Sequence, residues 1–209
     1  MPRPRPAAVV KIRTSCPGMR GKSVSSTIRS CAGGWPSESV DAASAFRILP
    51  ATPRDIPDVL AMIEALAEYE KLRHLCVATE ADLHAALFAP RPTAEVLVGW
   101  EGPARFAFAL FFHNFSTFLG RKGLYLEDLF VQPPYRGRGY GRALLSRLAG
   151  IALARDCGRF EWAVLDWNQN AIRFYETLGA VVLPDWRIAR VTGGALERLA
   201  ADGVRSPLS

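Results

Sequence analysis

The sequence predicts an α/β protein with a mixed central sheet, in the order β-α-α-β-β-β-α-β-α-β-β. Apolar runs of strand length alternate with longer stretches in which apolar residues recur every three or four positions. A loop with three alternating glycines, within residues 136–141, joins one such strand to one such helix. The length of 209 residues, with 49% hydrophobic residues, suits one domain with a sizeable core.

The helices are predicted from their caps and their apolar spacing. They cover about 52–72, 79–88, the stretch after the glycine loop to about 152, and 168–178. Their capping residues are Thr52 or Asp55, Thr79 with Asp82 in a capping box, and Asn168. Gly179 is suited to the residue just after the last helix.

The strands are predicted from β-branched and aromatic runs bounded by turn residues. They cover 46–49, 95–100, 105–112, 124–131 and 159–167, with closing strands at 180–183 and 188–192. The short Glu101-Gly-Pro sequence makes a hairpin of the second and third strands.

The first 45 residues are expected to form a disordered basic tail rich in Pro, Ser and Arg. This tail carries seven Lys and Arg against two acids, which is most of the net charge of +6. The remaining chain is nearly neutral, so the charge indicates no specific nucleic-acid surface. We expect a domain over 46–200, a C-terminal tail over 201–209, and no signal peptide or membrane span.

The four cysteines and three histidines lack the spacing of a metal site or of a disulfide framework. We therefore expect no metal. This cysteine pattern suits a reduced compartment, and we expect the protein to be cytoplasmic.

The glycine loop predicts an anion site. Gly137, Gly139 and Gly141 permit positive φ and close approach of a ligand, and the following helix directs its free N–H groups at the loop. A phosphate loop of the Gly-Lys-Ser/Thr kind is absent, and the glycines do not have the G-x-G-x-x-G spacing of a dinucleotide site.

The Arg136–Gly141 sequence matches the Arg/Gln-x-x-Gly-x-Gly/Ala motif of the GCN5-related N-acetyltransferases (GNAT), and the resemblance extends over about residues 46–200. It is strongest to the diamine branch, which acts on spermidine, spermine and thialysine. The sequences that carry it are LAEYE at 66–70, LYLEDLFV at 124–131, YRGRGYG at 135–141, WNQNAIRFY at 167–175 and Gly179-Ala180.

The resemblance implies acetyl-CoA as cosubstrate and a splayed central strand that binds it. The cofactor-binding residues it implies are Leu129, Phe130, Val131, Arg136, Gly137, Arg138, Gly139, Tyr140, Gly141, Arg142, Asn168 and Ala171. The backbone N–H groups of 129–131 would stabilise the oxyanion. Tyr69 and Glu70 would line the amine channel.

Acetyl transfer to an amine needs a neutral nitrogen, although a free alkylamine is protonated at neutral pH with a pKa of about 10. Glu127 or Asp128 could bind this cation and remove its proton. Strict alternation along a strand would let only one of them face the site. The resemblance implies that this residue is Glu127.

Tyr175 shares a helical face with apolar residues, which is typical of a core tyrosine. The family places a tyrosine at this motif position beside the acetyl-CoA sulfur, where its hydroxyl would protonate the departing thiolate. We therefore predict a catalytic role for Tyr175.

These observations predict an acetyl-CoA-dependent N-acetyltransferase that acts directly on a primary amine of a small basic substrate, and that forms a homodimer. Two alternatives stay open. The acceptor could be a lysine analogue, an amino acid or a protein amino group, or the chain could be a non-catalytic acyl-CoA sensor.

Overall fold

The computed structural model describes residues 46–205, and the expected N-terminal tail lies outside the described residues. The strands are β1 (Phe46–Pro50), β2 (Glu95–Glu101), β3 (Ala104–Ser116), β4 (Arg121–Val131) and β5 (Phe160–Trp162). The helices are α1 (Ile56–Tyr69), α2 (Glu80–Phe88), α3 (Tyr140–Ala154), α4 (Gln169–Glu176) and α5 (Gly193–Arg205). Three single 3-10 turns are η1 (Pro53–Asp55), η2 (Arg73–Leu75) and η3 (Pro133–Tyr135).

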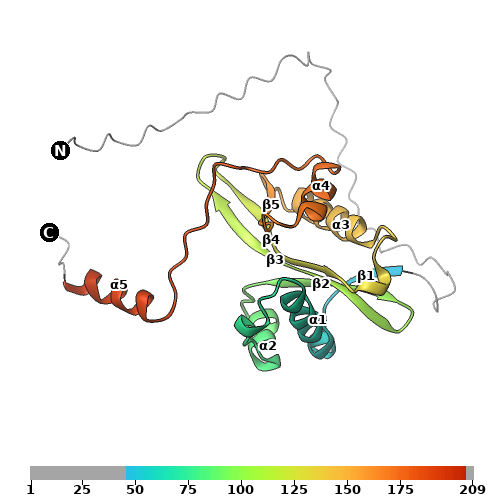
Figure 1. Ribbon diagram of the computed structural model, residues 1–209, viewed down its shortest axis with the longest axis horizontal. Helices are drawn as coiled ribbons and strands as arrows, with labels where there is room; N and C mark the ends of the chain where they lie inside the picture. Colours follow the sequence, from blue (N-terminus) through green and yellow to red (C-terminus); the bar gives the residue numbers. More distant parts are fainter. Residues whose placement is uncertain (1–45, 206–209) are drawn as a thin grey trace, which may run out of the picture. The chain divides into compact units, whose positions relative to one another are not determined.

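The five strands form one mixed sheet in the order β1-β2-β3-β4-β5, as predicted for this fold class. The first four strands pair in antiparallel fashion, and β5 is parallel to β4. Helices α1 and α2 cover one face of the sheet, and α3 and α4 cover the other (Figure 1).

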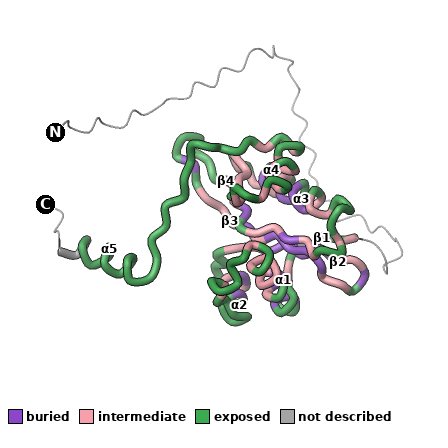
Figure 2. The backbone as a smooth tube through the Cα atoms, viewed as in Figure 1, coloured by how far each residue is buried: buried purple, intermediate pink, exposed green. Residues whose placement is uncertain are grey.

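Each face of the sheet has its own apolar core, because inward side chains of the strands alternate between the two helical layers. One core joins β3 and β4 to α3, and α4 packs at its margin. Its fully enclosed members include Phe106, Leu124 and Leu148. The second core joins β2 and β3 to α1 and α2 through Val59, Val98 and Phe108 among others. Burial is accordingly concentrated in the sheet (Figure 2).

A buried carboxylate fixes the start of α1. The side chain of Asp55 accepts hydrogen bonds from the backbone N–H and the hydroxyl of Thr52, at 2.7 and 2.8 Å. Arg105 on β3 donates its Nε–H to the other oxygen of Asp55 at 2.5 Å. This arrangement ties the first turn to the sheet, and the helix then ends at Tyr69, three residues earlier than expected.

The two closing strands predicted at 180–183 and 188–192 are wrong. Residues 181–192 form no strand, and α5 follows them at Gly193. All residues from 181 to 202 are exposed (Figure 2). Strand propensity reflects packing against neighbouring strands, and no described strand pairs with this segment.

Candidate active site

A β-bulge interrupts β4 at the acidic pair. Leu110 of β3 lies opposite Asp128, while the next residue, Phe111, lies opposite Leu126, so that Glu127 has no partner in β3. A bulge inserts one extra residue, and the alternation of side chains therefore changes phase there.

The phase change decides where the acidic side chains lie. Before the bulge, Leu124 and Leu126 pack on the α3 side of the sheet, and after it Leu129 takes that side. Asp128 consequently shares the α1 side with Phe130, which is buried in the second core. The strict alternation expected along β4 is therefore broken at the acidic pair, between Leu126 and Asp128.

The strands β4 and β5 separate just beyond the bulge. The register of β5 covers only Leu124–Leu126, although β4 continues to Val131. On the β5 side, residues 127–131 of β4 thus have no strand partner within the described part of the chain. This is the splay that the resemblance implied, and it leaves backbone groups available to an extended ligand.

The glycine loop follows β4 and leads into α3. Gly137 and Gly139 have φ values of 77° and 83°, in the region that favours glycine, and Gly139 is the N-cap of α3. A Cβ added at either position would meet nothing within 4 Å. Gly141 lies inside the helix, where an added Cβ would approach Phe174 of α4 at 3.9 Å. The loop thus combines an open surface with the free first-turn N–H groups of α3, which fits the pyrophosphate of acetyl-CoA.

The arginines of the loop have different partners. Arg136 donates its Nε–H to the carbonyl of Val131 at 2.8 Å, and its guanidinium lies over Tyr69, 5.1 Å from the ring centroid. Arg142 is exposed on the first turn of α3. The side chain of Arg138 approaches Glu101, with its Nη1 3.4 Å from the nearer carboxylate oxygen.

Glu101 was not predicted as a site residue. Its carboxylate also accepts a hydrogen bond of 2.6 Å from the hydroxyl of Tyr140, whose ring stacks on Phe46. The β2–β3 hairpin therefore holds the glycine loop in place. The short turn after Glu101 was visible in the sequence, but its approach to the loop depends on the sheet register.

Helix α4 and its N-cap contain two predicted site residues. Asn168 caps the helix by accepting the N–H of Ala171 at 3.2 Å. Tyr175 packs its ring edge-on against Trp162 of β5, 5.1 Å between centroids. Within the described residues nothing forms a hydrogen bond with its hydroxyl, and burial raises the pKa of this phenol. A phenol that stays protonated is a competent proton donor.

The two predicted substrate residues at the end of α1 lie close to these groups. The ring of Tyr69 contacts that of Trp167, in the loop before α4, at 6.0 Å between centroids. The Glu70 carboxylate is partly buried, and this burial raises its pKa. The sequence indicates Trp167 only as part of a motif, and its contact with α1 is visible only in the structure.

Asp128 is the most perturbed carboxyl group of the site. Burial is the main cause that raises its pKa to about 6, and the negative charges of Glu127 and Glu70 raise it further. Glu70 also contributes to the raised pKa of Tyr175. Through Glu70, the acids of β4 and the tyrosine of α4 are therefore electrostatically connected.

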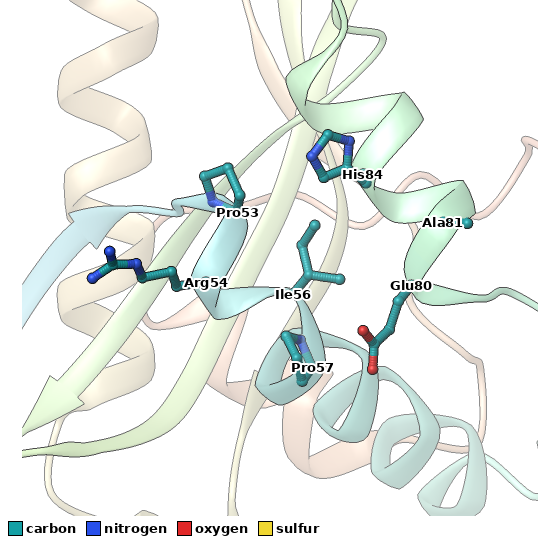
Figure 3. A pocket seen from close by; sticks show the side chains of 7 residues that line it. All are labelled: Pro53, Arg54, Ile56, Pro57, Glu80, Ala81 and His84. Atoms are coloured by element: carbon teal, nitrogen blue, oxygen red, sulfur yellow. The ribbon is translucent and has the colours of Figure 1, made fainter.

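Other hollows in the surface lie apart from these residues. One is lined by Pro53, Ile56 and His84, between the start of α1 and α2 (Figure 3).

Among residues 46–205, no group of three or more His, Cys, Asp or Glu side chains is arranged to hold a metal ion. None of the described helices has the length and apolar character to cross a membrane.

Comparison with known proteins agrees with this geometry. The model of the acetyltransferase (GNAT) family matches residues 61–180, and the chain belongs to this family of N-acetyltransferases.

Two curated relatives are similar over most of their length. An L-ornithine N5-acetyltransferase of Arabidopsis thaliana is 36% identical, over 73% of this chain and 87% of the relative. A thialysine N-epsilon-acetyltransferase of Mus musculus is 37% identical, over 74% of this chain and 96% of the relative. An integron cassette protein of V. cholerae shares the fold, with a TM-score of 0.63, 27% identity and coverage of 74% of this chain and 97% of that structure.

Proposed function

We propose that this enzyme uses acetyl-CoA to acetylate a primary amine of a small basic substrate with more than one charged group, as diamines and lysine analogues have. The observation that carries the proposal is the set of three carboxyl groups, Glu70, Glu127 and Asp128, beside the splay. Within the described residues, Asp128 has no hydrogen-bond or ion-pair partner. An ammonium group would supply the missing positive charge.

Acetyl-CoA as cosubstrate is supported by the glycine loop and by the splay. Gly137 and Gly139 leave space for the pyrophosphate, and the free edge of residues 129–131 suits the extended pantetheine arm. In this proposal the N–H groups of this edge stabilise the oxyanion.

The choice of a small amine is supported by the relatives. Two relatives are named for L-ornithine and thialysine, and a further relative, 32% identical, is a spermidine/spermine N(1)-acetyltransferase-like protein of Homo sapiens. These named substrates have in common an alkyl chain with more than one amine. A protein amino group is the alternative acceptor, which the same test addresses.

The test is a thiol-release assay with acetyl-CoA and a panel of thialysine, L-ornithine, spermidine, a monoamine of similar length and a lysine peptide. We expect kcat/KM to be at least about tenfold higher for an acceptor with two amines than for the monoamine, because a second ammonium gains a further carboxylate contact. Highest activity on the lysine peptide would instead favour protein acetylation.

We also propose that the enzyme is a homodimer. Large apolar side chains are exposed after α4 and around the end of β3 and the turn that follows it, and a soluble monomer rarely leaves so many uncovered. They are Val181, Val182, Leu183, Trp186, Ile188, Val191, Leu196 and Leu199 in the first segment, and Phe115, Phe118 and Leu119 in the second. Trp186 and Phe118 are 76% and 90% exposed.

The mass of the full chain in solution tests the dimer. Light scattering after size exclusion should give about twice the mass of one chain, and Trp186→Ser with Ile188→Ser should shift the mass toward one chain. Glu197→Gln, on the exposed α5, is the control and should not change it. A single-chain mass for the wild type would contradict the proposal.

A further inference from the structure

The bulge in β4 gives its two acids, Glu127 and Asp128, different surroundings, and this difference bears on which of them is suited to proton transfer. Glu127 is the inserted residue and is exposed, whereas Asp128 is partly buried on the side of the sheet that α1 covers. Asp128 pairs with Leu110 as the last pair of the ladder that runs to Val131, whereas Glu127 has no partner in β3. An ordered, partly desolvated group is better placed for proton transfer than an exposed one at a bulge.

The charged groups that act on Asp128 come from its own strand and from the end of α1. They are Glu127 on β4 and Glu70 directly after α1. Glu70 also acts on Tyr175 of α4. Arg136 of the glycine loop donates its Nε–H to the carbonyl of Val131 and lies over the rings of Tyr69 and Phe130. It forms no ion pair with Asp128.

We propose that Asp128, and not Glu127, takes the proton from the substrate ammonium, while Glu127 and Glu70 attract and hold the cation. This proposal rests on the proposed function, since it assigns roles within the same amine site. It differs from the role that the family resemblance gave to Glu127.

The pKa of about 6 supports this division of roles. A carboxyl group with that pKa is mostly ionised at neutral pH, yet it holds a proton much more readily than an ordinary aspartate. A base is most effective when its pKa lies near the working pH. Docking of an ammonium group would lower this pKa, and loss of the proton from the ammonium would raise it again.

The proposed reaction removes two protons from the substrate nitrogen. The carboxylate of Asp128 takes one proton from the ammonium, and the neutral nitrogen then forms a bond to the acetyl carbon as the carbon–sulfur bond breaks. Tyr175 gives its proton to the departing thiolate. The nitrogen loses its second proton as the amide forms, and this proton restores Tyr175. Asp128 then releases its proton to solvent.

The first test compares Asp128→Asn with Glu127→Gln on one basic diamine at about pH 7.5. For Asp128→Asn we expect kcat to fall by about 10²-fold or more, because the base is lost. For Glu127→Gln we expect a rise in KM of roughly tenfold with kcat within about threefold, because only attraction is lost. Both variants should bind acetyl-CoA as the wild type does by calorimetry.

The second test uses a fluorinated analogue of the same diamine, whose amines are mostly neutral at that pH. Such an acceptor needs no base, so the deficit of Asp128→Asn should shrink to within about tenfold. The opposite result would assign the base to Glu127. In that case Glu127→Gln would lose kcat on the ordinary diamine and regain it on the fluorinated amine, while Asp128→Asn would keep a kcat near that of the wild type. An undiminished deficit of Asp128→Asn on the fluorinated amine would also overturn the proposal.

The third test does not depend on activity. Since the pKa of Asp128 is raised in the folded protein, its charge destabilises the fold above about pH 6 and not when the group is protonated at lower pH. Asp128→Asn should therefore have a higher Tm than the wild type at pH 8, and the gain should vanish toward pH 4. A lower Tm at pH 8 would assign Asp128 a structural role. If the wild type acetylates none of the amines but the Tm values follow this pattern, the proposed function is wrong, whereas the partly buried environment inferred for Asp128 is right.

Discussion

Tyr175 shows how one side chain can belong to a core and to an active site. Its ring packs against Trp162 and Phe174 at the margin of the α3 core, while its hydroxyl has no hydrogen-bond partner within the described chain. The apolar spacing of α4 predicted the packing, and only the motif predicted the reactive hydroxyl. Both readings of the sequence are compatible, because they concern different atoms of the residue.

Removal of this hydroxyl should separate the two roles. Tyr175→Phe keeps the ring contacts, so we expect a Tm and an acetyl-CoA affinity close to those of the wild type. Loss of the proton donor should lower kcat by about 10²-fold. Raising the pH should not restore it, because the missing proton goes to the thiolate. Steady-state kinetics from pH 6 to 9 measure this, and a kcat like that of the wild type would return Tyr175 to a purely packing role.

Substitutions of the single residue Gly139 test the proposed anion site. Its φ of 83° is tolerated by Asn and Asp better than by other non-glycine residues, and space around it is open. Gly139→Asp places a negative charge at the proposed pyrophosphate position, and Gly139→Asn is its neutral control of equal size. Calorimetry should show acetyl-CoA binding at least about tenfold weaker for Asp than for Asn. Equal affinities would place the pyrophosphate elsewhere.

At the scale of elements, the sequence predicted α1 to α4 and the strands β1 to β4 well, because caps and apolar periods are local signals. Helix α5 was not predicted, and the strand expected at 159–167 covers only Phe160–Trp162. The bulge at Glu127 could not be predicted, since it is a mismatch in pairing between β3 and β4. The same limit explains why the closing strands were predicted wrongly. Their apolar residues have the pattern of strands, but no described strand pairs with them. Of the site, the glycine loop was predictable, whereas the contacts of Glu101 and Trp167 depended on register and packing.

Asp55 should contribute strongly to the attachment of α1. Burial alone would raise its pKa, but the hydrogen bonds from Thr52 and Arg105 together outweigh this and hold the pKa below its usual value. Asp55→Asn should therefore lower the free energy of unfolding by roughly 2–3 kcal/mol at neutral pH. Since the folded pKa is depressed, this contribution is present above about pH 4 and is lost as the pH falls through the folded value.

Urea denaturation at about pH 7 and pH 3 measures this difference. Asp58→Asn is the matched control, because Asp58 also pairs with Arg105, at 3.3 Å, but is about half exposed. We expect this control to cost less than about 1 kcal/mol. Equal losses for the two variants, or a loss for Asp55→Asn that persists at low pH, would contradict the role given to the buried pair.

At the scale of the whole molecule, both cores and all proposed site residues lie between Phe46 and Leu178. The basic N-terminal segment has too few patterned apolar residues to join a core, by its composition. A chain that starts at Ala45 should therefore keep the Tm and the kcat/KM of the full chain. Differential scanning calorimetry and the thiol-release assay measure this, and a large loss of either would show that the segment completes the fold or the site.

The central claim is that the splay of β4, the glycine loop and the three acids together transfer an acetyl group to a small amine. The most direct measurement follows the wild-type enzyme with acetyl-CoA and a diamine, and quantifies free CoA and acetylated amine by mass spectrometry in the same samples. The account predicts that the two products form in equal amounts and only when the amine is present. Release of CoA without acetylated amine, or no release with any small amine, would contradict it.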